Sequence, residues 1–64
     1  MTNEIGHKIK ELRGKYKMSA KQLGIELGLS QQHISRFENG KASLSVDTLY
    51  KISKVFNVNV EYFF

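Results

Sequence analysis

The chain has 64 residues, a formal net charge of +4 and no cysteine. This length allows one small domain with a thin core, which argues against an enzyme with a separate substrate domain. The absence of cysteine excludes a disulfide framework and a cysteine zinc site and is typical of the reducing cytoplasm, and no apolar run is long enough to span a membrane.

The positive charge is concentrated in the first two thirds of the chain. Residues 1–17 hold five bases against two acids, whereas residues 42–64 hold two of each. A basic excess of this kind permits nucleic-acid binding without establishing it, because lysine-rich solvated helix faces are common.

A first helix is predicted over residues 4–16. Its apolar residues recur at spacings of four, three and four, namely Ile5, Ile9, Leu12 and Tyr16. These spacings place them on one face of an α-helix, which is the face expected to pack on the core.

Four further helix starts are indicated by one arrangement, in which an apolar residue precedes a capping residue. It occurs at Met18-Ser19, Leu29-Ser30, Leu44-Ser45 and Val58-Asn59. Five positions after each of these four apolar residues there is a second one, and these are Leu23, Ile34, Leu49 and Phe63. This is the spacing of a hydrophobic staple around a Ser or Asn N-cap, so helices are expected to begin near residues 20, 31, 46 and 60.

Helix ends are indicated by residues that tolerate a left-handed backbone, which are Gly28, Asn39-Gly40 and Asn57. Starts and ends together predict an all-α fold of five helices, over residues 4–16, 20–27, 31–38, 46–56 and 60–64.

The second and third predicted helices are joined by only three residues, Gly28-Leu29-Ser30. Two helices joined by a three- or four-residue turn that contains glycine form a helix-turn-helix. Gly24 lies on the inward side of the second helix, where a glycine permits close backbone approach between crossing helices.

The third predicted helix has one polar face. Ile34 and Phe37 mark its buried side, while the opposite side carries Gln32, Ser35, Arg36 and Asn39, with Gln31 at the leading end. Glutamine can pair with adenine and arginine with guanine through two hydrogen bonds each in the major groove. The pattern therefore favours DNA reading, although an ordinary solvated face has the same composition.

Residues 19–41, SAKQLGIELGLSQQHISRFENGK, resemble the helix-turn-helix of the Xre family, the Cro and lambda-repressor-like regulators. Residues 38–41, Glu-Asn-Gly-Lys, are the most specific short motif, and the similarity extends over nearly the whole chain. The resemblance implies a compact bundle of five helices that binds operator DNA as a dimer, without cofactor or catalysis. It also implies a bacterial, phage or plasmid setting.

Carried onto this chain, the resemblance places Gln31, Gln32 and Arg36 at base-contacting positions. Ser30, His33 and Ser35 flank them. Asn39 and Lys41 are expected to hold backbone phosphates after the third helix, as are Ser19 and the amide of Ala20 before the second. Many family members have glutamine in place of Ala20, and either Lys21 or Gln22 is expected to compensate.

The same resemblance assigns Arg13 and Glu38 to an ion pair between the first and third helices. An acid at a helix C-terminus is disfavoured by the helix dipole, so a cationic partner would explain Glu38.

No catalytic or metal site is predicted. His7 and His33 lie on different predicted helices, and no nucleophile stands beside a base. At the C-terminus, Tyr62 and Phe64 are expected either to pack under the first helix or to form a dimer seam.

Residues 1–64 are interpreted as a single DNA-binding domain, complete or the N-terminal part of a longer regulator. The preferred function is a repressor that binds a palindromic operator as a dimer. An antitoxin, or a protein-interaction module that uses the same fold, is the alternative.

Overall fold

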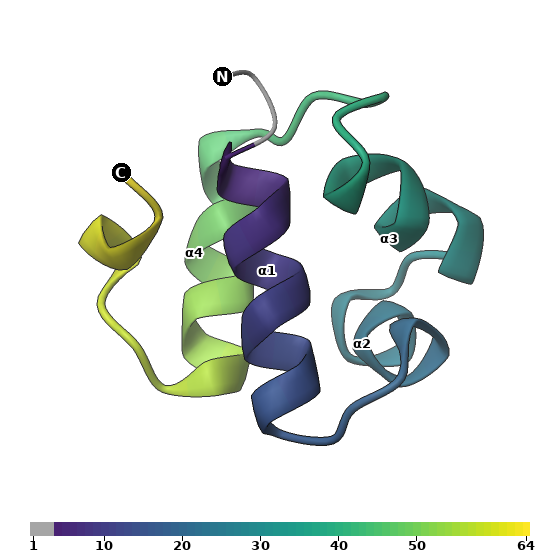
Figure 1. The fold of residues 1–64 in the computed structure, drawn as a ribbon, viewed down its shortest axis with the longest axis horizontal. Helices are drawn as coiled ribbons and strands as arrows, with labels where there is room; N and C mark the ends of the chain where they lie inside the picture. The colour runs from purple at the N-terminus through teal and green to yellow at the C-terminus, as the bar shows by residue number, and fades with distance from the viewer. Residues whose placement is uncertain (1–3) are drawn as a thin grey trace.

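The computed structural model describes residues 4–64, which form four α-helices and one short 3-10 helix (Figure 1). The elements are α1 (Glu4–Lys15), α2 (Ala20–Leu27), α3 (Gln31–Glu38), α4 (Val46–Phe56) and η1 (Val60–Phe63). Residues 4–64 contain no strand. The all-α prediction is confirmed, and the bounds of the second, third and fourth predicted helices are correct.

The prediction of a fifth α-helix is wrong, because residues 60–63 form a 3-10 turn instead. The Tyr62 amide donates to the Asn59 carbonyl over 2.9 Å and the Phe64 amide donates to the Glu61 carbonyl over 3.0 Å, which are three-residue steps. The Lys8 ammonium also donates to the Tyr62 carbonyl over 3.2 Å. The element has only four residues, and the tighter 3-10 turn is enough to complete its hydrogen bonds and to bury Phe63.

All four predicted N-caps are confirmed. The side-chain oxygens of Ser19, Ser30 and Ser45 each accept from the amide three residues later, and Asn59 accepts from the amide of Glu61. The apolar residues before the caps pack against the core, and these are Met18, Leu29, Leu44 and Val58. Local sequence therefore sets where each of these elements begins.

The four α-helices end in the same way, with one left-handed residue and two hydrogen bonds back into the last turn. The left-handed residues are Lys17, Gly28, Gly40 and Asn57. After α2, for example, the Leu29 amide donates to the Gly24 carbonyl and the Gly28 amide donates to the Ile25 carbonyl, as in a Schellman motif. Three of these ends were predicted, whereas the end at Lys17 was not.

Replacing Lys17 by glycine is expected to raise the free energy of unfolding by about 0.5–1 kcal/mol. A lysine at φ 53° is strained by its Cβ, and glycine removes that strain at some cost in unfolded-chain entropy. Urea unfolding measures the change. Lys15→Gly is the matched control, and it should lose about 1 kcal/mol because residue 15 lies within α1. Equal losses in both variants would show that Lys17 is not strained.

The core takes side chains from every element. Its buried apolar residues are Ile9, Leu12, Leu23, Ile34, Phe37, Leu49, Ile52, Phe56 and Phe63. Tyr16 departs from the predicted buried face, since it lies one residue beyond α1 and is 53% exposed. Its hydroxyl donates to the Phe56 carbonyl at the end of α4 over 2.9 Å, so the phenol covers the core edge instead of entering it.

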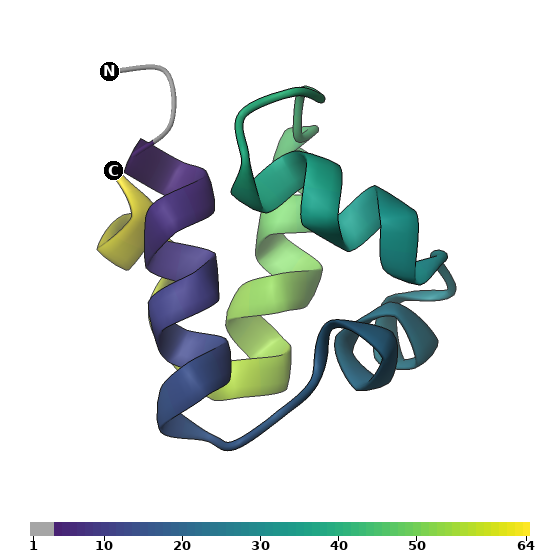
Figure 2. The same cartoon turned by 45° about the vertical axis from the view of Figure 1, so that its right-hand side comes forward.

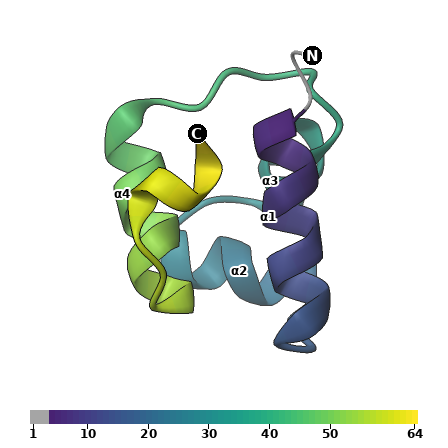
Figure 3. The same cartoon turned by 60° about the vertical axis from the view of Figure 1, so that its left-hand side comes forward.

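The elements divide the molecule into two sides. α2 and α3 pack on each other on one side, and Figures 1 and 3 show η1 on the opposite side, where it contacts α1 and α4. In Figure 2, α3 lies along the outer edge of the bundle. Among the described residues, no helix has the length and apolarity needed to cross a membrane.

Candidate nucleic-acid interface

The angle between α2 and α3 is set by a tight turn. Gly28 adopts φ 72°, and the Leu29 amide returns to the Gly24 carbonyl over 2.8 Å. A Cβ on Gly24 would lie 2.5 Å from the Leu29 carbonyl oxygen. The close approach predicted at Gly24 is therefore present, but its partner is the turn backbone and not a crossing helix.

One face of α3 is buried and the other is open. Ile34 and Phe37 enter the core, as predicted, while Gln31, Gln32 and Arg36 are exposed. Together with the half-buried Ser35, these three exposed side chains line one hollow on the surface. The hollow thus presents two carboxamides and a guanidinium, which are the groups that pair bidentately with base edges.

Residues 36 and 41 are tied together at the end of α3. The Lys41 amide donates to the Arg36 carbonyl over 2.8 Å, and the Arg36 Nη2 donates to the Lys41 carbonyl over 3.2 Å. Asn39 and the Lys41 side chain are exposed in this segment. The loop therefore holds a basic side chain beside the exposed face of α3.

His33 and Ser30 are joined at the start of α3. The Ser30 hydroxyl oxygen accepts from the His33 amide over 3.1 Å and lies 3.3 Å from His33 Nδ1. The imidazole therefore stays at the helix start, on the exposed surface beside Gln31 and Gln32.

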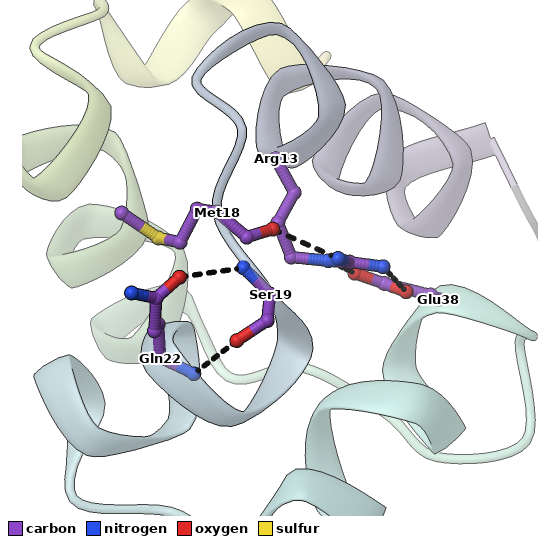
Figure 4. Close-up of polar contacts among 5 residues, drawn as sticks. All are labelled: Arg13, Met18, Ser19, Gln22 and Glu38. Atoms are coloured by element: carbon purple, nitrogen blue, oxygen red, sulfur yellow. Dashed lines mark hydrogen bonds and ion pairs between the residues drawn. The ribbon is translucent and has the colours of Figure 1, made fainter.

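The start of α2 forms a complete capping box (Figure 4). The Ser19 hydroxyl oxygen accepts from the Gln22 amide over 3.0 Å, and the Gln22 side-chain oxygen accepts from the Ser19 amide over 2.9 Å. Gln22 is thus engaged in capping, whereas Lys21 is exposed and Ala20 is half-buried.

Arg13 and Glu38 form a bidentate ion pair between α1 and α3 (Figure 4). Arg13 Nε and Nη2 donate to the two Glu38 carboxylate oxygens over 2.6 and 3.0 Å, and Arg13 Nη1 donates to the Met18 carbonyl over 2.9 Å. Glu38 is 5% exposed and Arg13 is 18% exposed. One guanidinium therefore links α1, the entry to α2 and the end of α3.

The hydrogen bonds that Arg13 donates to Glu38 raise the pKa of Arg13, burial opposes this effect, and the negative charge of Glu38 adds to it. A raised pKa in a base stabilises the fold fully below the ordinary arginine value and loses that effect only as the pH rises through the folded value. Arg13 therefore stays charged in the pair at every pH used for binding.

The chain matches the helix-turn-helix family HTH_3 over residues 9–63. It belongs to this family. An uncharacterized HTH-type transcriptional regulator of Archaeoglobus fulgidus is 37% identical over 54 residues, which cover 84% of this chain and 76% of that protein. The Xre-like resemblance seen in the sequence is confirmed.

Two solved structures share the fold. The restriction-modification controller protein C.AhdI from Aeromonas hydrophila has a TM-score of 0.90 over 98% of this chain and 91% of its own, at 21% identity. The P22 c2 repressor, solved in complex with synthetic operator 9T, has a TM-score of 0.84 over 92% of this chain and 89% of its own, at 27% identity.

In this HTH_3 chain, one residue that positions α3 was not predicted from the sequence. Gly6 of α1 lies against the end of α3, where a Cβ would clash with the Phe37 carbonyl oxygen and lie 2.9 Å from that of Glu38. A glycine on the apolar side of an amphipathic helix indicates a close contact, but the sequence does not show which backbone lies opposite it. Gly6 and Arg13 together fix α3 against α1.

The HTH_3 chain has no cluster of three His, Cys, Asp or Glu side chains within residues 4–64 that could hold a metal ion.

Proposed function

We propose that this chain is a sequence-specific regulator that binds double-stranded DNA through the exposed face of α3. The observation that carries the proposal is the shared hollow of Gln31, Gln32 and Arg36 on a helix anchored at both ends. The similarity to the P22 c2 repressor, which was solved with its operator, supports it.

Base selection is assigned to the hollow, because carboxamides match adenine and a guanidinium matches guanine. Register on the duplex is assigned to phosphate contacts on both sides of α3. The proposed phosphate or flanking residues are Ser19, Ala20, Lys21, Ser30, His33, Ser35, Asn39 and Lys41. Arg13 and Glu38 hold α3 in place and do not contact the bases.

Two copies of the chain are proposed to bind a palindromic operator, with their α3 helices about 34 Å apart in successive major grooves. Of the two roles considered for the C-terminal aromatics, the dimer seam is favoured for Phe64, which is 73% exposed. Tyr62 lies against α1, where the Lys8 ammonium is 5.7 Å from its ring centroid, and Phe63 is buried and closes the core. Occupation of the operator would repress transcription by excluding polymerase.

The proposal is tested by selection from random-sequence duplexes, followed by affinity measurements at several salt concentrations. A palindromic consensus and a strong fall in affinity with salt are expected, since phosphate contacts release counterions. Equal affinity for all duplexes at low salt would refute sequence-specific binding and favour a protein-interaction role.

Arg36→Ala and Lys41→Ala are expected to weaken binding in different ways. Arg36→Ala should relax the preference at one base position and cost about 1–3 kcal/mol, whereas Lys41→Ala should weaken all sequences alike and reduce the salt slope by about 1. Lys51→Ala removes the same charge from an exposed site on α4 and serves as the control. Identical sequence profiles for the first two variants would contradict this division of roles.

Phe64→Ser is expected to weaken binding to the full palindrome by about tenfold or more while leaving binding to an isolated half-site unchanged, because linked sites gain affinity only through the seam. Its melting temperature should hardly change, since Phe64 is exposed. Phe63→Ser is the contrasting variant and should unfold the domain. Unchanged affinity for the palindrome in Phe64→Ser would exclude the C-terminal seam.

A further inference from the structure

The two exposed partners Arg36 and Lys41 are joined in both directions, through the main chain and through the arginine side chain. The main-chain bond requires the chain to turn back after α3, and Gly40 allows this at φ 72°. The side-chain bond, from Arg36 Nη2 to the Lys41 carbonyl over 3.2 Å, fixes one corner of the guanidinium. Both contacts are set by the Gly40–Lys41 turn.

We propose that the Lys41 main-chain carbonyl positions Arg36 and thereby sets the base preference of α3. This inference rests on the proposed DNA-binding function and extends it to the group that orients the reading side chain. Lys41 is a positioning residue here, because its carbonyl acts on the base through Arg36.

The reason lies in the shape of the guanidinium. Its five N–H groups lie in one plane, and bidentate pairing with guanine requires that plane to face the O6 and N7 edge. A carbonyl that holds one N–H leaves the other donors to a base. It also reduces the conformational freedom that a long side chain would lose on binding.

The two paired arginines of the structure differ in the partner that holds them. Arg13 is neutralised by the Glu38 carboxylate and is 18% exposed. Arg36 is exposed, and the one hydrogen bond of its side chain within residues 4–64 is to a neutral carbonyl. The carbonyl therefore orients the guanidinium without neutralising its positive charge, and a side chain that pairs with guanine needs that charge.

The same turn also carries the Lys41 ammonium proposed to contact phosphate. One residue would then fix the register of the chain on the backbone and the orientation of the reading arginine. The Gly40–Lys41 turn would in this way couple position on the duplex to base choice.

The test weakens the Lys41 carbonyl without changing any side chain. In a chemically synthesised 64-residue chain, lactic acid in place of Ala42 converts the Lys41–Ala42 amide to an ester, whose carbonyl is a poorer acceptor. Within residues 4–64 the Ala42 amide has no backbone acceptor, so this ester removes no other backbone bond. An ester between Ser43 and Leu44 in the same loop is the matched control.

Dissociation constants are measured for the selected operator and for the operator changed at the base position that Arg36→Ala relaxes. The unmodified chain should prefer the original base by about 5- to 150-fold, the range expected for one bidentate pair. The Lys41 ester should reduce that preference at least about threefold, whereas the control ester should leave it unchanged. Equal loss in both esters, or no loss in either, would overturn the inference.

Two further results distinguish the possible failures. A rise in operator affinity in the Lys41 ester would show that the carbonyl competes with the base for Arg36, which overturns positioning but keeps DNA binding. No preference among duplexes by the unmodified chain would overturn both proposals.

A measurement on the free protein is independent of DNA. The Arg36 Nε–H order parameter from NMR relaxation should exceed about 0.6, the value below which a group is flexible. It should fall in the Lys41 ester and remain high in the control ester. A flexible Arg36 in the unmodified chain would also overturn the inference.

Discussion

Glu38→Ala is expected to lower the free energy of unfolding by about 3–5 kcal/mol, because it leaves the Arg13 charge without its carboxylate partner at a partly buried site. For a domain of this size, the melting temperature should fall by about 12 °C or more. Urea unfolding and thermal melts measure the two quantities.

DNA affinity should fall together with stability in Glu38→Ala. The ion pair fixes the C-terminal end of α3 on α1, and the side chains proposed to contact bases project from that helix. The loss of affinity should appear for every duplex, since no base contact is removed.

Glu26→Ala is the matched control for this variant. It removes the same charge from an exposed position on α2 and should change stability by no more than about 0.5 kcal/mol. A double variant with Arg13→Met and Glu38→Leu should recover much of the loss, since neither charge remains buried. A melting temperature unchanged by Glu38→Ala would refute the bridging role of the pair.

Gly6→Ala is expected to destabilise the fold, with a net loss of about 2 kcal/mol in the free energy of unfolding. Its Cβ would meet the carbonyl oxygens of Phe37 and Glu38, and neither backbone oxygen can rotate away. Overpacking of this kind costs about 1–3 kcal/mol or more, against a gain of about 1 kcal/mol in helix propensity.

Gly14→Ala is the control with the opposite sign. Nothing lies within 4 Å of its added Cβ, so only the helix propensity changes and stability should rise by about 1 kcal/mol. If both variants were stabilised, α1 and α3 would not approach as closely as the structure describes.

Helix starts and most helix ends were predictable, because each depends on a few neighbouring residues. Ser19, Ser30, Ser45 and Asn59 cap helices through contacts no more than three residues away. The end at Lys17 was not predictable from a propensity, since lysine does not favour a left-handed backbone. There the packing of Met18 against the core accompanies the turn.

The type of the last element depended on tertiary contacts. The cap at Asn59 and the buried Phe63 were predicted, but a 3-10 turn and an α-helix share these signals. The hydrogen bond from Lys8 to the Tyr62 carbonyl crosses 54 residues, and no local pattern contains it.

Within the candidate site, residue types were predictable and acceptors were not. The exposed carboxamides and guanidinium of α3 follow from periodicity around Ile34 and Phe37. The carbonyls of Met18 and Lys41, which hold Arg13 and Arg36, could not be predicted, because every residue carries a carbonyl. Only the fold selects which one an arginine reaches.

The central claim is that the exposed face of α3 lies against duplex DNA. Chemical-shift mapping of the isotope-labelled chain, titrated with its selected duplex, tests it most directly. The largest shifts are expected at the side-chain amides of Gln31 and Gln32 and at Nε of Arg36. Shifts confined to α4 and η1, with these three groups unchanged, would contradict it.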